Sequence, residues 1–190
     1  MSDLQIDPKK TALVVIDLQK GIVAQTPQPH AANDVISRTR QIAEKLRAKG
    51  GVCVYVRVNM SDFLQLPVDQ PMRPPNAPPP PPDASELVPE AGYQPSDILI
   101  TKRHWGAFAG TDLELQLKQR GVTTVLLTGI SSNIGVESTA RQGTGLGFAF
   151  IIVEDACSAR EESQHRWSFD QIFPRLARVR KTEDILAALA

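Results

Sequence analysis

The 190-residue chain lacks the features that mark several broad classes of protein. It has only two cysteines, Cys53 and Cys157, which are too few for a disulfide framework and fit a reducing compartment. No apolar stretch approaches the roughly 20 residues that a membrane-spanning helix needs, and the N-terminus has no apolar core of signal-peptide length. We therefore expect a soluble cytoplasmic protein with no membrane partner.

The chain also lacks an excess of charge of either sign, since 21 Lys and Arg residues balance 21 Asp and Glu residues. A net charge of zero gives no electrostatic reason to expect a nucleic acid as partner. Apolar residues make up 42% of the chain, which is typical of a folded globule. The length suits one compact core, and we expect a single domain over residues 1–190.

Short apolar runs alternate along the chain with stretches of helical spacing. The apolar runs predict strands over residues 11–16, 52–58, 97–100, 123–127, 148–153 and 176–179. Helices are predicted over residues 31–49, 111–120, 161–173 and 182–189, the last capped by Thr182. The apolar runs are continuous, which is typical of parallel strands buried on both faces. This order predicts an α/β fold with a parallel sheet between two layers of helices.

One segment, residues 60–96, interrupts the alternation of strands and helices. Nine of the 15 prolines fall between Pro67 and Pro82, and proline lacks the backbone N–H that helices and sheets need. We predict an extended insertion loop here. It is either a plain surface insertion or a functional one, namely a flap over the site or an arm that packs on a neighbouring subunit.

Reactive side chains follow two of the predicted strands, at the sheet edge where parallel α/β proteins bind ligands. Asp17 directly follows the first strand, where a poorly hydrated carboxylate suits general acid or base chemistry, unless it only caps the next turn. Lys102 follows the third strand and could stabilise negative charge on a substrate, unless it is a surface lysine. Gln19, Trp105 and Phe108 are candidate pocket residues, although aromatic side chains are also typical of a core.

A third candidate is the turn over residues 129–136, which separates an apolar strand from a helix. α/β hydrolases present a nucleophile at such a turn, but this chain has Gly135 at its focus. Backbone N–H groups at the start of the following helix could face a substrate oxygen. A glycine also allows close packing of backbone and helix, so Gly135 alone is weak evidence for a site.

Four segments together resemble the isochorismatase-like hydrolase family in order and spacing, from about Thr11 to Val179. They read Val-Val-Ile-Asp-Leu-Gln, Lys-Arg-His-Trp-Gly-Ala-Phe, Gly-Ile-Ser-Ser-Asn-Ile-Gly-Val-Glu-Ser-Thr-Ala-Arg and Val-Glu-Asp-Ala-Cys. The resemblance implies a Rossmann-like, three-layer α/β/α sandwich with a six-stranded parallel sheet. It also implies a homo-oligomer that acts on a small-molecule substrate.

The resemblance assigns roles to individual residues. The usual triad of the family is Asp, Lys and Cys, which correspond here to Asp17, Lys102 and the position of Gly135. A cis peptide bond is implied between Ile130 and Ser131. The N–H groups of Ser131 and Gly135 would form the oxyanion site, and neither depends on a side chain. The constellation is therefore expected to persist without the thiol.

We expect no catalytic metal and no cofactor. Nicotinamidase-like members of the family bind a metal through Asp and His residues. Of the three histidines here, His30 and His165 lie outside the matching segments, and His104 has no partner at ligand spacing.

The reaction implied by the resemblance proceeds without a covalent intermediate, because thioester chemistry needs a thiol. True isochorismatases also carry glycine at this position and cleave a vinyl ether to release pyruvate. Asp17 would then be the general acid, Lys102 would tune it, and Gly135 would leave room for the substrate ring. The neighbouring Ser131-Ser132-Asn133, however, is similar to the cysteine-hydrolase branch. Another small carbonyl or enol ether substrate is therefore an alternative, as is an inactive member that serves as a binding or assembly protein.

Overall fold

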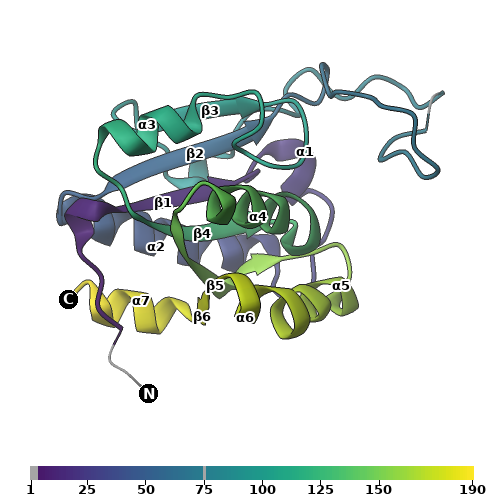
Figure 1. Ribbon diagram of the computed structural model, residues 1–190. Helices are drawn as coiled ribbons and strands as arrows, with labels where there is room; N and C mark the ends of the chain where they lie inside the picture. The colour runs from purple at the N-terminus through teal and green to yellow at the C-terminus, as the bar shows by residue number, and fades with distance from the viewer. Residues whose placement is uncertain (1–3, 75) are drawn as a thin grey trace.

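The computed structural model describes residues 4–74 and 76–190, and its centre is a six-stranded parallel sheet (Figure 1). The strand order is β3-β2-β1-β4-β5-β6. The bounds of the strands are β1 Thr11–Ile16, β2 Val52–Val58, β3 Ile98–Lys102, β4 Thr124–Ile130, β5 Ala149–Ser158 and β6 Arg178–Arg180. The predicted α/β fold with a six-stranded parallel sheet is confirmed.

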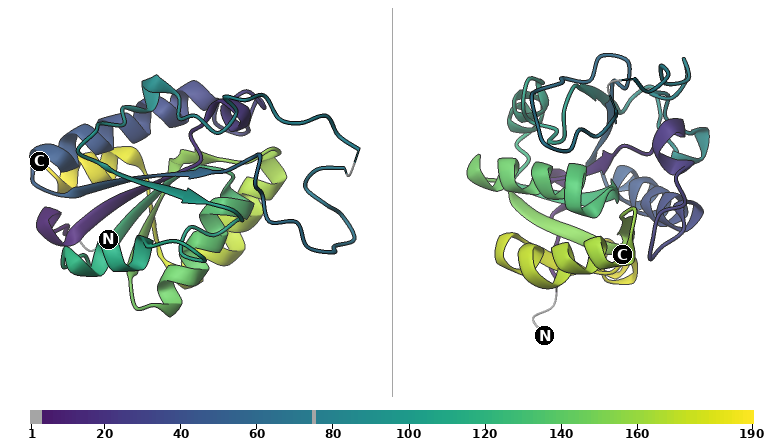
Figure 2. Two further views of the ribbon diagram at one scale, coloured as in Figure 1. Left: turned by 90° about the horizontal axis from the view of Figure 1, so that it is seen from above. Right: turned by 90° about the vertical axis from the view of Figure 1, so that its right-hand side faces the viewer.

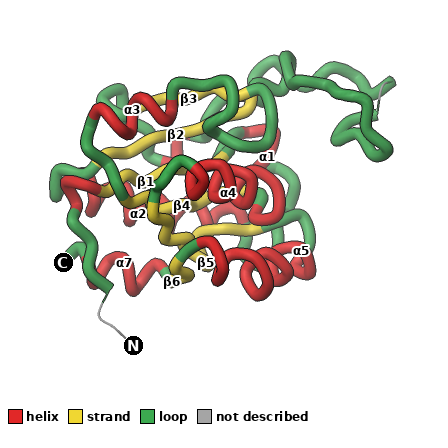
Figure 3. Tube along the Cα trace, viewed as in Figure 1, coloured by secondary structure: helices red, strands yellow, loops and turns green. Residues whose placement is uncertain are grey.

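Helices and helical turns connect the strands (Figure 3). The α-helices are α1 Lys20–Val23, α2 Ala32–Ala48, α3 Leu113–Gln119, α4 Glu137–Gly145, α5 Glu162–Trp167, α6 Phe173–Leu176 and α7 Thr182–Ala188. The shorter turns are η1 Pro8–Lys10, η2 Pro89–Ala91, η3 Ser132–Val136 and η4 Ser168–Ile172, of which η3 and η4 are π-helical.

The sheet lies between two layers of helices (Figure 2). Two hydrophobic clusters, one on each face of the sheet, hold the three layers together. Alternate residues of β1 point to opposite faces, so Leu13 and Val15 belong to one cluster and Val14 and Ile16 to the other. Helices α2 and α7 cover the first face, whereas α3, α4 and the α5–α6 region cover the second. Burial on both faces explains why the strands read as continuous apolar runs.

The structure corrects three details of the predicted elements. Strands β4 and β5 run further than their apolar cores, to Ile130 and Ser158. The predicted helix over residues 161–173 is divided into α5, η4 and α6. Thr182 does not cap α7, because the cap position is Lys181, whose N–H donates to Asp184 Oδ2 at 2.9 Å.

The proline-rich insertion leaves the end of β2 and returns to β3. In its described residues the only helical turn is η2. Figures 1 and 2 show the loop that follows β2 projecting beyond the edge of the sheet on both sides of residue 75. We call residues 60–82 the arm; it exposes four large apolar side chains, those of Leu64, Leu66, Val68 and Met72. No helix in the described part of the chain is long and apolar enough to cross a membrane.

Candidate active site

The first two candidate residues form an ion pair at the carboxyl edge of the sheet. Lys102 Nζ lies 2.7 Å from Asp17 Oδ2, although 85 positions separate the two residues. The register explains the meeting: β2 lies between β1 and β3, with Val56 beside Ile16 and Val58 beside Lys102. Both side chains are buried, with residue exposures of 5% for Asp17 and 2% for Lys102.

Asp17 sits in an environment that opposes ionisation of its carboxyl. Burial raises its pKa above the ordinary value of 3.8, and the Lys102 ammonium opposes this shift through its charge and hydrogen bond. Oδ1 of Asp17 has no hydrogen-bond partner among the described residues. Its φ of 55° is in the left-handed region, a conformation that non-glycine residues rarely adopt and that clusters at functional sites. The carboxyl therefore has one oxygen available to exchange a proton.

Lys102 is fixed by two acceptors. Besides Asp17, its Nζ donates to the carbonyl oxygen of Trp105 at 2.7 Å. Trp105 is 38% exposed, and its ring stacks on His104 at a centroid distance of 5.7 Å. Trp105 therefore serves the ion pair through its backbone, while its ring remains accessible from outside.

Gly135 completes the set of three. A Cβ added to Gly135 would lie 3.1 Å from Asp17 Oδ2, 3.4 Å from Lys102 Nζ and 2.8 Å from the Cγ2 methyl of Ile16. A side chain at this position would thus point directly at the ion pair. The contact with Ile16 is shorter than real Cβ contacts, so the surroundings fit glycine closely.

The turn that carries Gly135 is held against β1 by a second glycine. The Ile130–Ser131 peptide bond is cis. Gly129, with φ of 122°, brings β4 so close to β1 that a Cβ there would lie 2.1 Å from the Ile16 carbonyl oxygen. The N–H groups of Ile134 and Val136 both donate to the Ser131 carbonyl at 3.1 Å. This carbonyl is therefore occupied inside the turn and does not compete for a ligand.

Two of the predicted pocket residues have other roles. The Gln19 side chain is fully buried, and its Nε2 donates to the Val58 and Ala84 carbonyls while its Oε1 accepts from the Val58 N–H. Its amide joins β1 to the insertion and has no free group for a substrate. Phe108 packs on Phe148 in the core at a centroid distance of 5.7 Å. Both side chains are thus engaged inside the fold in this structure, and their assignment to the substrate pocket stays a prediction.

The two cysteines are structural. Both are buried and free, and burial raises the pKa of each thiol, to about 12 for Cys53. Cys157 lies beside Gly129 in the sheet, with its Sγ 3.9 Å from the Leu127 carbonyl oxygen. Neither thiol has the lowered pKa that a nucleophile at neutral pH would need.

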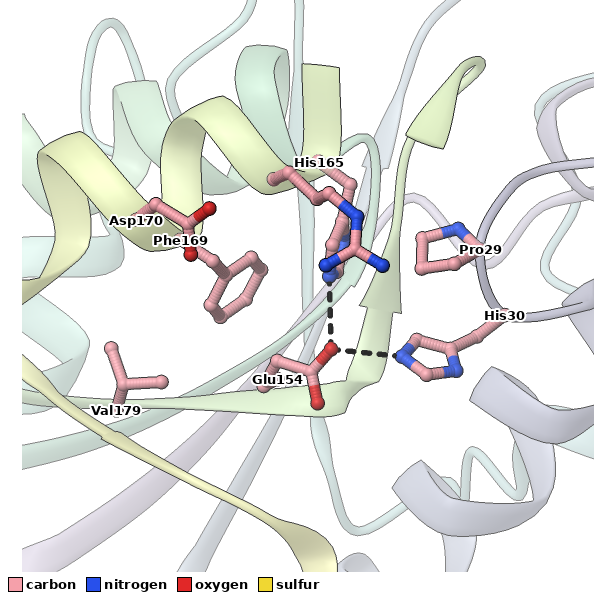
Figure 4. A pocket seen from close by; sticks show the side chains of 8 residues that line it. Pro29, His30, Glu154, His165, Phe169, Asp170 and Val179 are labelled. Carbon is pink, nitrogen blue, oxygen red and sulfur yellow. Dashed lines mark hydrogen bonds and ion pairs between the residues drawn. The ribbon is translucent and has the colours of Figure 1, made fainter. Parts of the chain in front are cut away.

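A second polar cluster, which the sequence did not reveal, lies around the end of β5 (Figure 4). It consists of His30, Glu154 and His165, and both imidazoles contact the same carboxylate oxygen. We call it the His-Glu-His cluster. These residues line a cavity of about 320 Å³ with residues such as Arg166 and Asp170. No short motif connects the three, since 124 and 11 positions separate each histidine from Glu154.

Comparisons with known proteins agree with this architecture. Residues 11–184 match the Isochorismatase domain family. The chain is 50% identical over 198 aligned positions to the uncharacterized isochorismatase family protein YecD of Escherichia coli O157:H7, covering 98% of this chain and all of that protein. It is 42% identical over 189 aligned positions to the uncharacterized isochorismatase family protein YwoC of Bacillus subtilis (strain 168), covering 98% and 97%.

Solved structures agree as well. An isochorismatase family protein from Burkholderia thailandensis superimposes with a TM-score of 0.90 at 38% identity, covering 99% of both chains. A cysteine hydrolase from Pseudomonas syringae pv. phaseolicola shares the fold, with a TM-score of 0.77 at 21% identity and coverage of 100% of this chain and 98% of that one.

Proposed function

The chain belongs to the isochorismatase family, and we propose that it is a small-molecule hydrolase that works without a covalent enzyme intermediate. The observation that carries this proposal is the position of Gly135. The Cβ direction of Gly135 points at Asp17 Oδ2 and Lys102 Nζ, at 3.1 and 3.4 Å. The acid and the cation of the site are thus retained around a residue that cannot attack a substrate.

Hydrolysis of a vinyl ether needs only such groups. The Asp17 carboxyl adds its proton to the vinyl carbon, and the C=C electron pair forms the new C–H bond. Water then adds to the oxocarbenium carbon and returns a proton to Asp17. The hemiketal breaks its C–O bond as its hydroxyl proton passes to the leaving oxygen, which releases pyruvate when the substrate is isochorismate. Lys102 stabilises the transient Asp17 carboxylate, and the Ser131 and Gly135 N–H groups would hold a substrate oxygen.

Pyruvate release from isochorismate tests this proposal. We expect turnover by the native protein and a decrease of about 10²- to 10⁴-fold in kcat for Asp17→Asn, because the substituted amide cannot donate the proton. Asp34→Asn is the matched control, since Asp34 is exposed on α2, and it should retain full activity. Equal rates for the native protein and Asp17→Asn would contradict the role of Asp17.

A second candidate is an inactive member that binds a small molecule. The tight surroundings of the site favour it: Asp17, Lys102 and Gly135 are all buried, and the Ile16 methyl fills the space beside Gly135. This candidate predicts no turnover across a panel of vinyl ethers, amides and imides, together with tight binding of one small ligand in calorimetry. Turnover of any panel member that Asp17→Asn abolishes would contradict it.

The arm supports a third candidate role, in assembly of a homo-oligomer. Its four exposed apolar side chains would be buried if the arm packed on a second copy of the chain. Deletion of residues 67–82 should then lower the mass measured by analytical ultracentrifugation and leave ligand binding intact. An unchanged mass would show that the arm does not hold subunits together.

A further inference from the structure

We propose that His30, Glu154 and His165 bind one divalent first-row transition-metal cation, such as Zn²⁺. Two imidazoles and one carboxylate form a donor set that suits this class of ion and leaves a position open for water. The site is distinct from the Asp17–Lys102 pair and shares no side chain with it. The inference does not depend on the proposed hydrolase activity.

The spacing of the ligand atoms is close to what a tetrahedral site requires. Glu154 Oε1 lies 3.0 Å from His30 Nε2 and 3.1 Å from His165 Nε2, and the three ligand atoms lie within 4.8 Å of one another. Bonds of about 2.0–2.1 Å in a tetrahedron place neighbouring ligand atoms about 3.3 Å apart. To bind the ion, Glu154 would move by a few tenths of an ångström, and the two imidazole nitrogens, which lie within 4.8 Å of each other, would approach to about 3.3 Å.

A serine orients the buried histidine for this role. His165 Nδ1 lies 2.8 Å from the Ser132 hydroxyl oxygen, and the ring stacks on Phe169. Metal-binding histidines usually have such a partner on the other ring nitrogen. In the tautomer with the proton on Nε2, Ser132 donates to Nδ1 and Nε2–H donates to Glu154. With a metal on Nε2, the proton would reside on Nδ1 and the serine oxygen would accept it. The serine can thus be the partner of Nδ1 with or without the ion.

The backbone holds the third ligand in place. The N–H of Gln28 donates to the Ala159 carbonyl at 2.8 Å, and the N–H of Ala159 donates back at 2.9 Å. The His30 N–H donates to Ser158 Oγ at 3.3 Å. The segment between α1 and α2 is thus attached to the end of β5, which directs the His30 ring at Glu154 (Figure 4).

The charges around the cluster permit a cation. The cavity is lined by one basic residue, Arg166, and one further acid, Asp170. The Arg166 guanidinium is paired with Glu162, with Nε donating to Oε1 at 2.7 Å, which offsets its repulsion of a metal ion. The cavity of about 320 Å³ has room for the water molecules that would complete the coordination.

Metal titration of chelator-treated, untagged protein tests the proposal. Zn²⁺ at about 100 times its Kd should raise the Tm by about 5–10 °C, and calorimetry should give one ion per chain. Co²⁺ should give the visible absorption of a tetrahedral site, and Mg²⁺, which prefers oxygen ligands, should have no effect. Absence of Zn²⁺ binding to the native protein would overturn the proposal.

Variants locate the ion. Glu154→Gln keeps the shape of the carboxylate, and both it and His30→Ala should abolish the Zn²⁺ response. Ser132→Ala should weaken binding about 10- to 100-fold without removing a ligand. The controls are Asp170→Asn, in the same cavity, and His104→Ala, the histidine outside the cluster, and both should bind Zn²⁺ as the native protein does. Unchanged Zn²⁺ affinity in Glu154→Gln and His30→Ala would place the ion elsewhere and overturn the proposal.

Discussion

Two carboxylates at the same edge of the sheet experience opposite environments. Asp17 has one cationic partner, Lys102, and burial raises its pKa above 3.8. Glu154 is 26% exposed and meets two imidazoles, and the hydrogen bond from His165, supported by that from His30, lowers its pKa from 4.5 to about 2. The balance between desolvation and the number of hydrogen-bond donors thus shifts the pKa values of these two carboxyl groups in opposite directions.

These opposite pKa shifts suit Asp17 and Glu154 to different chemical roles. A carboxyl with a raised pKa can hold and donate a proton, as the proposed hydrolysis requires of Asp17. A carboxyl with a lowered pKa stays anionic over the whole physiological range, as a metal ligand must. Experiments that change the partners of each carboxylate should therefore have unequal effects.

The largest expected effect on stability comes from breaking the closed site. Lys102→Met removes the cationic partner of the buried Asp17 and should lower the free energy of unfolding by about 3 kcal/mol, measured by urea denaturation. Lys118→Met, which removes an exposed partner of Glu114 on α3, is the control and should cost less than about 0.5 kcal/mol. Equal losses would mean that the site is not a dry, closed environment.

An intermediate effect is expected at Gly135. Gly135→Ala places a methyl group 2.8 Å from Ile16 Cγ2, and the resulting overpacking should cost about 1–3 kcal/mol of unfolding free energy. The control is Gly145→Ala at the end of α4, where an added Cβ meets no described atom within 4 Å and should stabilise by about 0.4–1 kcal/mol. A neutral Gly135→Ala would indicate that the site is more open than its contacts suggest.

A third effect concerns Glu154 and depends on pH. Because its folded pKa is lowered, its contribution to metal-free stability is fully present above about pH 4.5 and is lost as the pH falls toward about 2. We therefore expect the native protein to lose its stability advantage over Glu154→Gln as the pH falls from about 4.5 to about 2. A difference that stays constant between pH 5 and 2 would contradict the shift.

The sequence predicted the fold well, because continuous apolar strands and amphipathic helices are local signals. It missed the ends of β4 and β5, where Thr128, Gly129 and the polar residues after Val153 conceal strands that extend into the site. It also missed the division of the helix over residues 161–173, because a π-helical turn has no distinct composition.

The candidate site was predictable to the extent that its residues follow strands. Asp17, Lys102 and Gly135 each follow a strand end or its turn, and parallel strands bring such positions together. The contacts that Gln19 and Phe108 make inside the fold could not be predicted, because spacing along the chain does not give side-chain direction. The residues of the His-Glu-His cluster come from three segments of the chain, so their proximity is visible only in the three-dimensional structure.

Titration of the side-chain carboxyl carbons by ¹³C NMR in metal-free protein compares the two carboxylates directly. We expect Asp17 to titrate above 3.8 and Glu154 near 2, and Asp17 to titrate still higher in Lys102→Met because the opposing cation is gone. An Asp17 carboxyl that titrates at or below 3.8 would contradict its proposed role as the general acid.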